Sequence, residues 1–241
     1  MCGRISLFAP PDLVAERFDA EPVRPLESRY NVAPGQAHPV VRNDDPDAIR
    51  FPTWGLVPQW ASESDGAGAG ANAGHINARA ETLAEKPSFR EAFAERRCLV
   101  LADGFYDWKE TPTGKQPYRI EREGREPMAL AGLWEPAANA DTATFTVVTT
   151  EPNEVVEPIH HRMPVVLEPD EEERWLRGGG REDDGTGAGP EGLGDLLDPH
   201  PASEMRAYPV SSKLGDPEND SPDVIEEVPA EEDVQTGLDE F

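Results

Sequence analysis

Five apolar segments in the middle of the chain constrain its fold more than any other feature. They read CLVLADGFYDW, QPYRIE, PMALAGLW, ATFTVVTT and MPVVL, and all lie between residues 98 and 167. Each is short, rich in β-forming residues and separated from the next by turn residues, as in antiparallel barrels and sandwiches. We therefore predict an α+β fold that is rich in strands, with barrel-like antiparallel sheets and a few short helices.

The predicted helices are marked by prolines, apolar spacing and charge. PPDLVAERF has early prolines and predicts a helix over about 12–18. KPSFREAFAERR places Phe89 and Phe93 four residues apart on one helical face, and DEEERWLRG predicts a late helix. Further short strands are predicted in HPVVRND, AIRFPTWGLVP and AYPVSSKLG.

The chain of 241 residues is long enough for one sizeable core. We expect a single domain over residues 1–228. Within it, DGAGAGANAG predicts a mobile loop over about 62–74, and RGGGREDDGTGAGPEG predicts a disordered acidic insertion over about 178–195. Residues 229–241 are predicted to form an acidic, disordered tail.

The net charge is strongly negative and unevenly distributed. Lysine and arginine number 22 against 48 acids, which gives −26, and residues 168–198 and 216–241 together account for −19 of it. The remaining −7 still permits a local basic groove, so the overall charge does not exclude DNA as a partner. A cytosol of very high salt would explain the acidity, because carboxylate-rich surfaces stay hydrated there.

Only two cysteines are present, at positions 2 and 98. Cys98 lies in an apolar run and is expected to be a buried, inert thiol. Two such cysteines do not make a disulfide framework, and neither a secretory signal nor an apolar run of membrane-spanning length is seen. We expect a soluble, cytoplasmic monomer with no membrane partner.

Two polar motifs are candidates for chemistry. HINARAET places Asn77, Arg79 and Glu81 at alternate positions, so an extended segment would put all three on one face, where burial requires a ligand or mutual pairing. IHHRMP places His160 and His161 before a proline-led strand, and one of the two rings is expected to point away.

The residues leave several kinds of site open. A metal site is disfavoured because HExxH and CxxC spacings are absent, and a serine hydrolase because GxSxG is absent. A cysteine hydrolase that uses Cys2 with His160 remains open. Removal of Met1 would also leave Cys2 with a free α-amine beside its thiol, two nucleophiles on one residue.

Eight motifs in order give a more specific indication. MCGR, RYNVAPGQ, WGLVPQW, INARAET, ADGFYDW, AGLWE, IHHRMPVVL and PVSSKLG resemble the SRAP family, the SOS response-associated peptidase or abasic-site processing proteins. The resemblance covers residues 2 to about 228. It implies a compact, strand-rich domain with a positively charged cleft for single-stranded DNA, and a covalent crosslink from the N-terminal cysteine to abasic sites.

The resemblance also implies roles for individual residues. Cys2 would form a Schiff base and then a thiazolidine, Asn77 would position the sugar, and His160 would be the acid/base. Asp107 matches a family glutamate and is one methylene shorter. The arginines Arg4, Arg79 and Arg162 match positions that contact the DNA backbone.

Two tryptophans, Trp54 and Trp60, begin and end the WGLVPQW motif and have different expected roles. Trp60 is a candidate for stacking on an unpaired base, whereas Trp54 is expected in the core.

The sequence therefore predicts a sensor of abasic sites in single-stranded DNA that needs neither a cofactor nor a metal. The family name adds a proteolytic activity, such as self-removal of Met1. Two alternatives stay open: an N-terminal-cysteine hydrolase that acts on a small amide or peptide, and a non-catalytic single-strand binding module.

Overall fold

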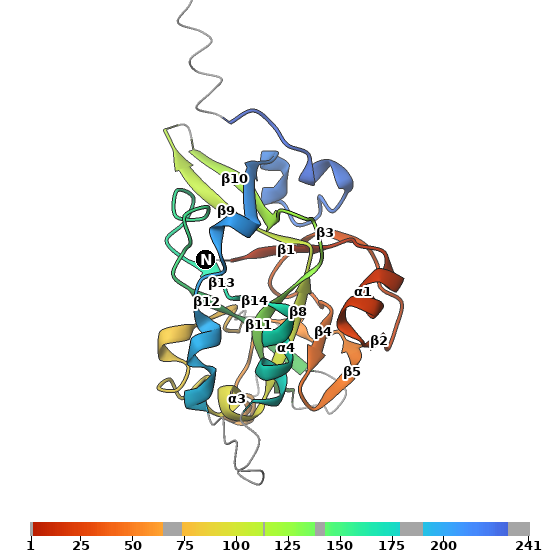
Figure 1. The fold of residues 1–241 in the computed structure, drawn as a ribbon, viewed down its shortest axis with the longest axis vertical. Helices are drawn as coiled ribbons and strands as arrows, with labels where there is room; N and C mark the ends of the chain where they lie inside the picture. The colour runs from red at the N-terminus through yellow and green to blue at the C-terminus, as the bar shows by residue number, and fades with distance from the viewer. Residues whose placement is uncertain (1, 65–73, 113, 138–142, 179–189, 231–241) are drawn as a thin grey trace, which may run out of the picture.

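The computed structural model describes residues 2–64, 74–112, 114–137, 143–178 and 190–230. Within these residues the strands form two sheets, one of five strands and one of ten (Figure 1). The strand-rich α+β prediction is confirmed. No helix in the described part of the chain has the length and apolar character needed to cross a lipid bilayer.

The smaller sheet carries the N-terminal strand near its centre. Its members are β1 (Arg4–Leu7), β3 (Arg29–Val32), β9 (Gly104–Thr111), β10 (Gly114–Arg122) and β15 (Met205–Pro209). Their spatial order is β15-β10-β9-β1-β3, and every pair is antiparallel. Strand β1 therefore lies between β3 and β9, so its first residues are held from both sides.

The larger sheet has a central path of seven strands with three short strands added to it. Its members are β2 (Glu21–Pro22), β4 (Val40–Arg42), β5 (Asp45–Arg50), β6 (Thr53–Trp54), β7 (Asn77–Arg79), β8 (Arg97–Ala102), β11 (Met128–Pro136), β12 (Ala143–Thr150), β13 (Met163–Pro164) and β14 (Val166–Leu167). The path runs β13-β12-β11-β8-β4-β5-β2, β14 pairs with β11, and β6 and β7 pair with β12. Strand β12 thus brings β7 and β13 close to each other.

Strand β8 shows how the sequence fills two cores at once. Cys98, Val100 and Ala102 face the core between the two sheets, whereas Leu99 and Leu101 face the helices on the other side. Successive side chains of a strand point to opposite faces, so an unbroken apolar run fits a strand that is covered on both faces. Cys98 is fully buried, as predicted.

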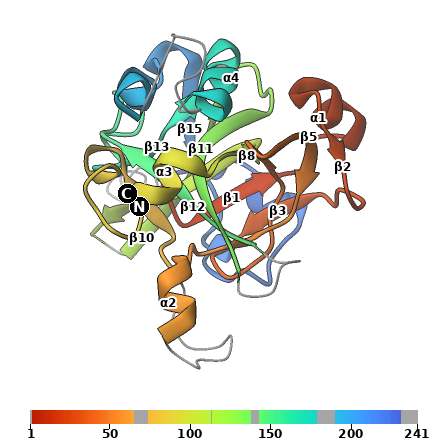
Figure 2. The same cartoon turned by 90° about the horizontal axis from the view of Figure 1, so that it is seen from below.

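Helices cover the far face of the larger sheet (Figures 1 and 2). They are α1 (Pro11–Phe18), α3 (Arg90–Glu95) and α4 (Pro169–Arg177), and a further helix, α2 (Gln59–Ser64), projects from the body of the molecule in Figure 2. Trp175 of α4 is fully buried, and its indole N–H donates to the Cys98 carbonyl at 3.0 Å. Helix α4 also has acids in its first turn and arginines in its last, which complements the helix dipole.

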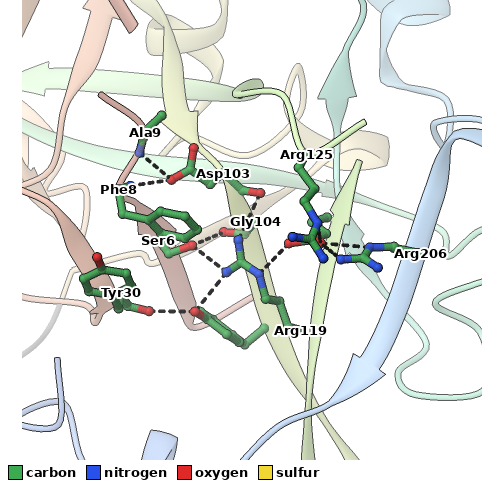
Figure 3. A network of polar contacts seen from close by, with 11 residues as sticks. Ser6, Phe8, Ala9, Tyr30, Asp103, Gly104, Arg119, Arg125 and Arg206 are labelled. Atoms are coloured by element: carbon green, nitrogen blue, oxygen red, sulfur yellow. Dashed lines mark hydrogen bonds and ion pairs between the residues drawn. The ribbon is translucent and has the colours of Figure 1, made fainter. Parts of the chain in front are cut away.

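A buried arginine organises the outer face of the smaller sheet (Figure 3). Arg119 of β10 donates to Glu121 at 2.7 Å, to the Ser6 hydroxyl at 2.7 Å and to the Tyr106 hydroxyl at 3.0 Å. A Cβ at Gly104 would lie 2.8 Å from the guanidinium carbon, so only glycine leaves room for this side chain. Beside it, Tyr106 packs with residues of the C-terminal segment 210–228, which covers the same face.

Two details of the fold differ from the sequence expectations. Three short pairs, β2 with β5 and both β6 and β7 with β12, are parallel rather than antiparallel. Pro190–Leu197, the end of the predicted disordered insertion, forms a 3-10 helix, because Leu193 and Leu196 are buried against the helical core.

The other segments predicted to be mobile or disordered lie mostly outside the described residues. The glycine-alanine loop overlaps 65–73, and its first predicted residues belong to α2, which runs to Ser64. Most of the acidic insertion, at 179–189, and the tail from residue 231 are likewise not described.

Candidate active site

Cys2 lies just ahead of β1, at the junction of the two sheets. Arg4 is opposite Tyr106 in the β1–β9 register, so Cys2 is carried next to the part of β9 that holds Asp107. The Cys2 side chain is fully buried, and its Sγ lies 3.8 Å from the carbonyl oxygen of Arg4. Burial raises the pKa of the thiol well above its usual value, and the Asp107 carboxylate raises it further. The thiol is therefore protonated in this conformation.

Asn77 connects Cys2 to the larger sheet. Strand β7 runs parallel to β12, with Asn77 opposite Val147. The Asn77 amide Nδ2 donates to the Cys2 carbonyl at 2.9 Å and to the Ile76 carbonyl at 2.6 Å. Its Oδ1 is buried and accepts no hydrogen bond from the described residues. A buried polar atom left in this way is costly, and it provides an acceptor for a ligand hydroxyl.

Asp107 and His160 complete the group. Asp107 is buried on β9, and its Oδ1 accepts the Trp108 backbone N–H at 3.0 Å. Its Oδ2 lies 3.7 Å from His160 Nδ1, beyond hydrogen-bonding distance but close enough to stabilise a positive charge on the ring. Burial lowers the pKa of His160 below 6.5, and Asp107 opposes that shift without reversing it. His160 is therefore neutral at pH 7.

The His160 ring is held by the segment that follows it. The Arg162 backbone N–H donates to His160 Nδ1 at 3.0 Å, and the Arg162 carbonyl lies 3.2 Å from the same nitrogen. The His161 ring stacks on His160 with the centroids 4.2 Å apart. Our expectation that one ring points away is wrong, because the two histidines lie in a loop before β13 and not in a regular strand.

An open pocket of about 710 Å³ adjoins these residues. Asp107 and His160 line it together with Trp108, His161 and Gly215, among others. The site thus has buried acid/base groups at the edge of a space large enough for a nucleotide-sized ligand.

The candidate DNA contacts differ in their accessibility. Arg79 is exposed on β7, and Trp60 on α2 is 58% exposed. Arg4 donates to the carbonyls of Gly3 at 2.9 Å and Gly215 at 3.2 Å. Their contacts with DNA stay predictions.

Arg162 is the least accessible of the predicted contacts, with 8% of its surface exposed. Its guanidinium pairs with Glu81 and also donates to the Thr149 carbonyl at 2.5 Å. Glu81 follows β7 in a 3-10 helix (Ala80–Thr82), so Asn77, Arg79 and Glu81 do not continue along one strand face as predicted. Glu81 of this motif forms its ion pair with Arg162, and not with Arg79 of the same motif.

Sequence reasoning missed the C-terminal wall of the pocket. Asn31 of β3 is buried, and its Nδ2 donates to the carbonyls of Leu214 at 3.2 Å, Asp216 at 2.9 Å and Asn219 at 3.0 Å. These bonds hold the loop that carries Gly215 beside Arg4 and the pocket. RYNVAPGQ and PVSSKLG contain Asn31 and Gly215, so the motifs were visible, but their pairing over nearly the whole chain was not.

A separate cluster has donor atoms of the kind that bind metals. Glu168, His200 and Glu204 place one donor atom each within 4.8 Å of the others, near the start of α4. The Arg122 guanidinium lies 3.2 Å from Glu168 and 3.1 Å from Glu204. Because Arg122 already forms an ion pair with each carboxylate, we interpret this cluster as a structural ion-pair network.

The chain matches the family model described as SOS response associated peptidase (SRAP) over residues 1–217. It belongs to the SRAP family. The abasic site processing protein YoqW of Bacillus subtilis is 40% identical over 94% of this chain and 99% of its own length. The abasic site processing protein HMCES of Gallus gallus is 32% identical over 81% of this chain and 65% of its own.

Solved structures give the same fold. A protein from Bacteroides thetaiotaomicron superposes with a TM-score of 0.78 and 26% identity, over 95% of this SRAP chain and all of the other. A protein from Bordetella bronchiseptica has a TM-score of 0.70 and 23% identity, over 87% and 100% of the two chains. The strand-rich SRAP-type fold is therefore confirmed.

Proposed function

We propose that this SRAP protein processes abasic sites in single-stranded DNA by forming a covalent crosslink through Cys2 after removal of Met1. The observation that carries the proposal is the convergence of four side chains. Cys2 precedes β1 and Asp107 lies on β9 of the smaller sheet, whereas Asn77 lies on β7 of the larger sheet and His160 in the loop before β13. The Asn77 amide is 2.9 Å from the Cys2 carbonyl. The relatives named abasic site processing proteins support the choice of substrate.

The chemistry follows from the two nucleophiles on one residue. The α-amine of Cys2 attacks the aldehyde carbon of the ring-opened sugar, and water leaves as the imine forms. The thiol sulfur then adds to the imine carbon, and its proton passes to the nitrogen, which closes a five-membered thiazolidine. Amine and thiol sit on adjacent carbons, so the second step has the high effective concentration of an intramolecular reaction.

The geometry favours the amine as the first nucleophile. The Cys2 thiol is buried and protonated, so it is a poor nucleophile until its proton is removed. Neutral His160 is suited to exchange a proton with the sugar or the imine, and Asp107 stabilises the imidazolium that results. The Asn77 Oδ1 is an acceptor for a sugar hydroxyl.

DNA binding would use exposed groups around this centre. Arg79 offers a guanidinium for phosphate, and Trp60 offers a ring for stacking on an unpaired base. Ion-pair affinity for single strands falls with log salt at a slope of about −0.7 per phosphate neutralised. In molar salt we expect stacking and the covalent bond to dominate, so the crosslink yield should depend only weakly on salt concentration.

A denaturing gel tests the proposal. The purified protein is mixed, in high KCl, with a single-stranded oligonucleotide that has one abasic site, and with an undamaged one. Mass spectrometry of the free protein reports whether Met1 has been removed. We expect a shifted band that requires the lesion and Cys2, is lost in Cys2→Ala and persists in Cys98→Ala, which removes the other buried thiol.

A second variant separates the two steps. Cys2→Ser keeps an α-amine but lacks the sulfur, so it should give an adduct that survives denaturation only after borohydride reduction. Absence of any wild-type band, with Met1 removed, would refute the crosslink. Turnover of a small amide substrate would then favour the N-terminal-cysteine hydrolase.

A further inference from the structure

Glu81 is a motif residue to which the proposed chemistry gives no part. Its carboxylate makes a two-point contact with the Arg162 guanidinium, in which Arg162 Nη2 lies 3.0 Å from Glu81 Oε2 and Nη1 bonds to Oε1. Hydrogen bonding to Arg162 lowers the pKa of Glu81, so the carboxylate is ionised at neutral pH. Half of the Glu81 side chain is exposed, whereas Arg162 lies almost entirely within the protein.

The Arg162 guanidinium is also fixed by the backbone of β12. The Nη2 that contacts Glu81 also donates to the Thr149 carbonyl of β12 at 2.5 Å. Thr149 pairs with Pro164 of β13 and with Arg79 of β7, so the guanidinium lies where three strands meet. Without the carboxylate, a nearly buried cation would lack its counter-charge and would move towards water.

The backbone of the same residue determines the state of His160. The Arg162 peptide N–H can only donate, so His160 Nδ1, at 3.0 Å, must accept and carry no proton in this contact. In the neutral ring the proton therefore lies on Nε2. The Arg162 carbonyl, 3.2 Å from the same nitrogen, can accept a proton that Nδ1 gains later. The backbone of one residue thus offers a partner to both protonation states of an acid/base group.

We propose that Glu81 is a positioning residue for His160: by fixing the Arg162 guanidinium, it holds the Arg162 peptide against Nδ1 and so sets the tautomer and orientation of the imidazole. The proposal rests on the proposed function, in which His160 moves the proton. It also means that a phosphate could bind the Arg162 guanidinium only by displacing Glu81.

Nitrogen-15 spectra of the histidine rings test the tautomer without any DNA. We expect the wild-type His160 ring, identified by its loss in His160→Gln, to show the Nε2–H pattern at neutral pH. Glu81→Ala should shift it towards a mixture of tautomers, and Glu81→Gln, which keeps one acceptor for Arg162, should fall between. Glu85→Ala removes an exposed carboxylate four residues away and should leave the ring signals unchanged.

Crosslinking rates supply the second measurement. A correctly placed acid/base group contributes about 10²–10⁴-fold, so its partial misplacement should slow Glu81→Ala by about ten-fold, with Glu81→Gln intermediate. Unchanged ring signals in a folded Glu81→Ala protein would overturn the proposal. Faster crosslinking would also overturn it and would identify Glu81 as a competitor of phosphate. If the wild type forms no crosslink, the proposed function fails, and the ring spectra still decide this inference.

Discussion

At the scale of single residues, Asp107 is the candidate site residue whose distance from its partner decides what it can do. Its Oδ2 lies 3.7 Å from His160 Nδ1, which is too far for a direct hydrogen bond. Backbone anchoring by Trp108 fixes the carboxylate in that place. Asp107 is thus in a position to stabilise charge on His160 but needs a shift, or a bridging water, to exchange a proton with it.

Replacing Asp107 with asparagine removes the negative charge of the side chain but keeps its size, so it tests the effect of the charge alone. We expect Asp107→Asn to slow Schiff-base formation by about 10²-fold, because imidazolium loses its counter-charge while the packing is retained. Single-turnover crosslinking, with Glu110→Gln on the same strand as the charge control, measures the effect. A rate equal to that of the wild type would remove Asp107 from the mechanism.

His38 predicts how stability depends on pH. It is fully buried, its Nε2 lies 2.6 Å from the Leu101 carbonyl, and burial lowers its pKa from 6.5 to about 4. The unfolded chain therefore binds a proton between these values that the folded chain does not, so stability falls as the pH drops from 6.5 to 4. The shift corresponds to about 3 kcal/mol at 1.36 kcal/mol per unit.

Chemical denaturation of wild type and His38→Phe at pH 7 and pH 4 measures this contribution. The variant should lose about 3 kcal/mol less than the wild type over that range. Equal losses in both proteins would mean that His38 is protonated in the folded state at a normal pKa.

At the scale of elements, the hydrogen bonds of the Asn31 side chain join β3 to the C-terminal segment. Asn31→Ala removes a side-chain donor from three carbonyls of that segment, although the Asp216 carbonyl still accepts the Asn219 backbone N–H. We expect the free energy of unfolding to fall by about 2–3 kcal/mol. Hydrogen exchange should also rise across residues 212–220. Asn219→Ala removes one exposed bond to Lys213 in the same loop and should change both measurements little. Normal protection of the loop in Asn31→Ala would show that its other contacts, such as those of the Asp220 carboxylate with the Tyr30 and Asn31 backbone N–H groups, are enough to hold it.

Most strands and helices could be predicted from the sequence because each has a local pattern of apolar residues. The run from Cys98 to Ala102 predicts a strand by composition, and Phe89 with Phe93 predicts a helical face. The parallel pairing of β7 with β12 has no such signal, because it depends on partners far apart in the chain. For the same reason the sequence indicated Arg162 as a site residue and Glu81 as part of a polar motif, but not the contact between them.

At the scale of the whole molecule, the charge of −26 makes salt a determinant of stability. Mutual repulsion of carboxylates opposes the compact state and is screened by ions. We expect the melting temperature to rise markedly between low and molar KCl. Equal melting temperatures in the two conditions would contradict adaptation to a salty cytosol.

The candidate site residues are spread along most of the chain. Cys2 precedes β1, Asn77 lies on β7, Asp107 lies on β9, and His160 comes last, in the loop before β13. A ribosome that has made only the first hundred residues has released the cysteine without the carboxylate and imidazole that serve it. Under the proposed function, catalytic assistance by these groups belongs to the finished protein, and incomplete translation products should react with DNA lesions more slowly than it does.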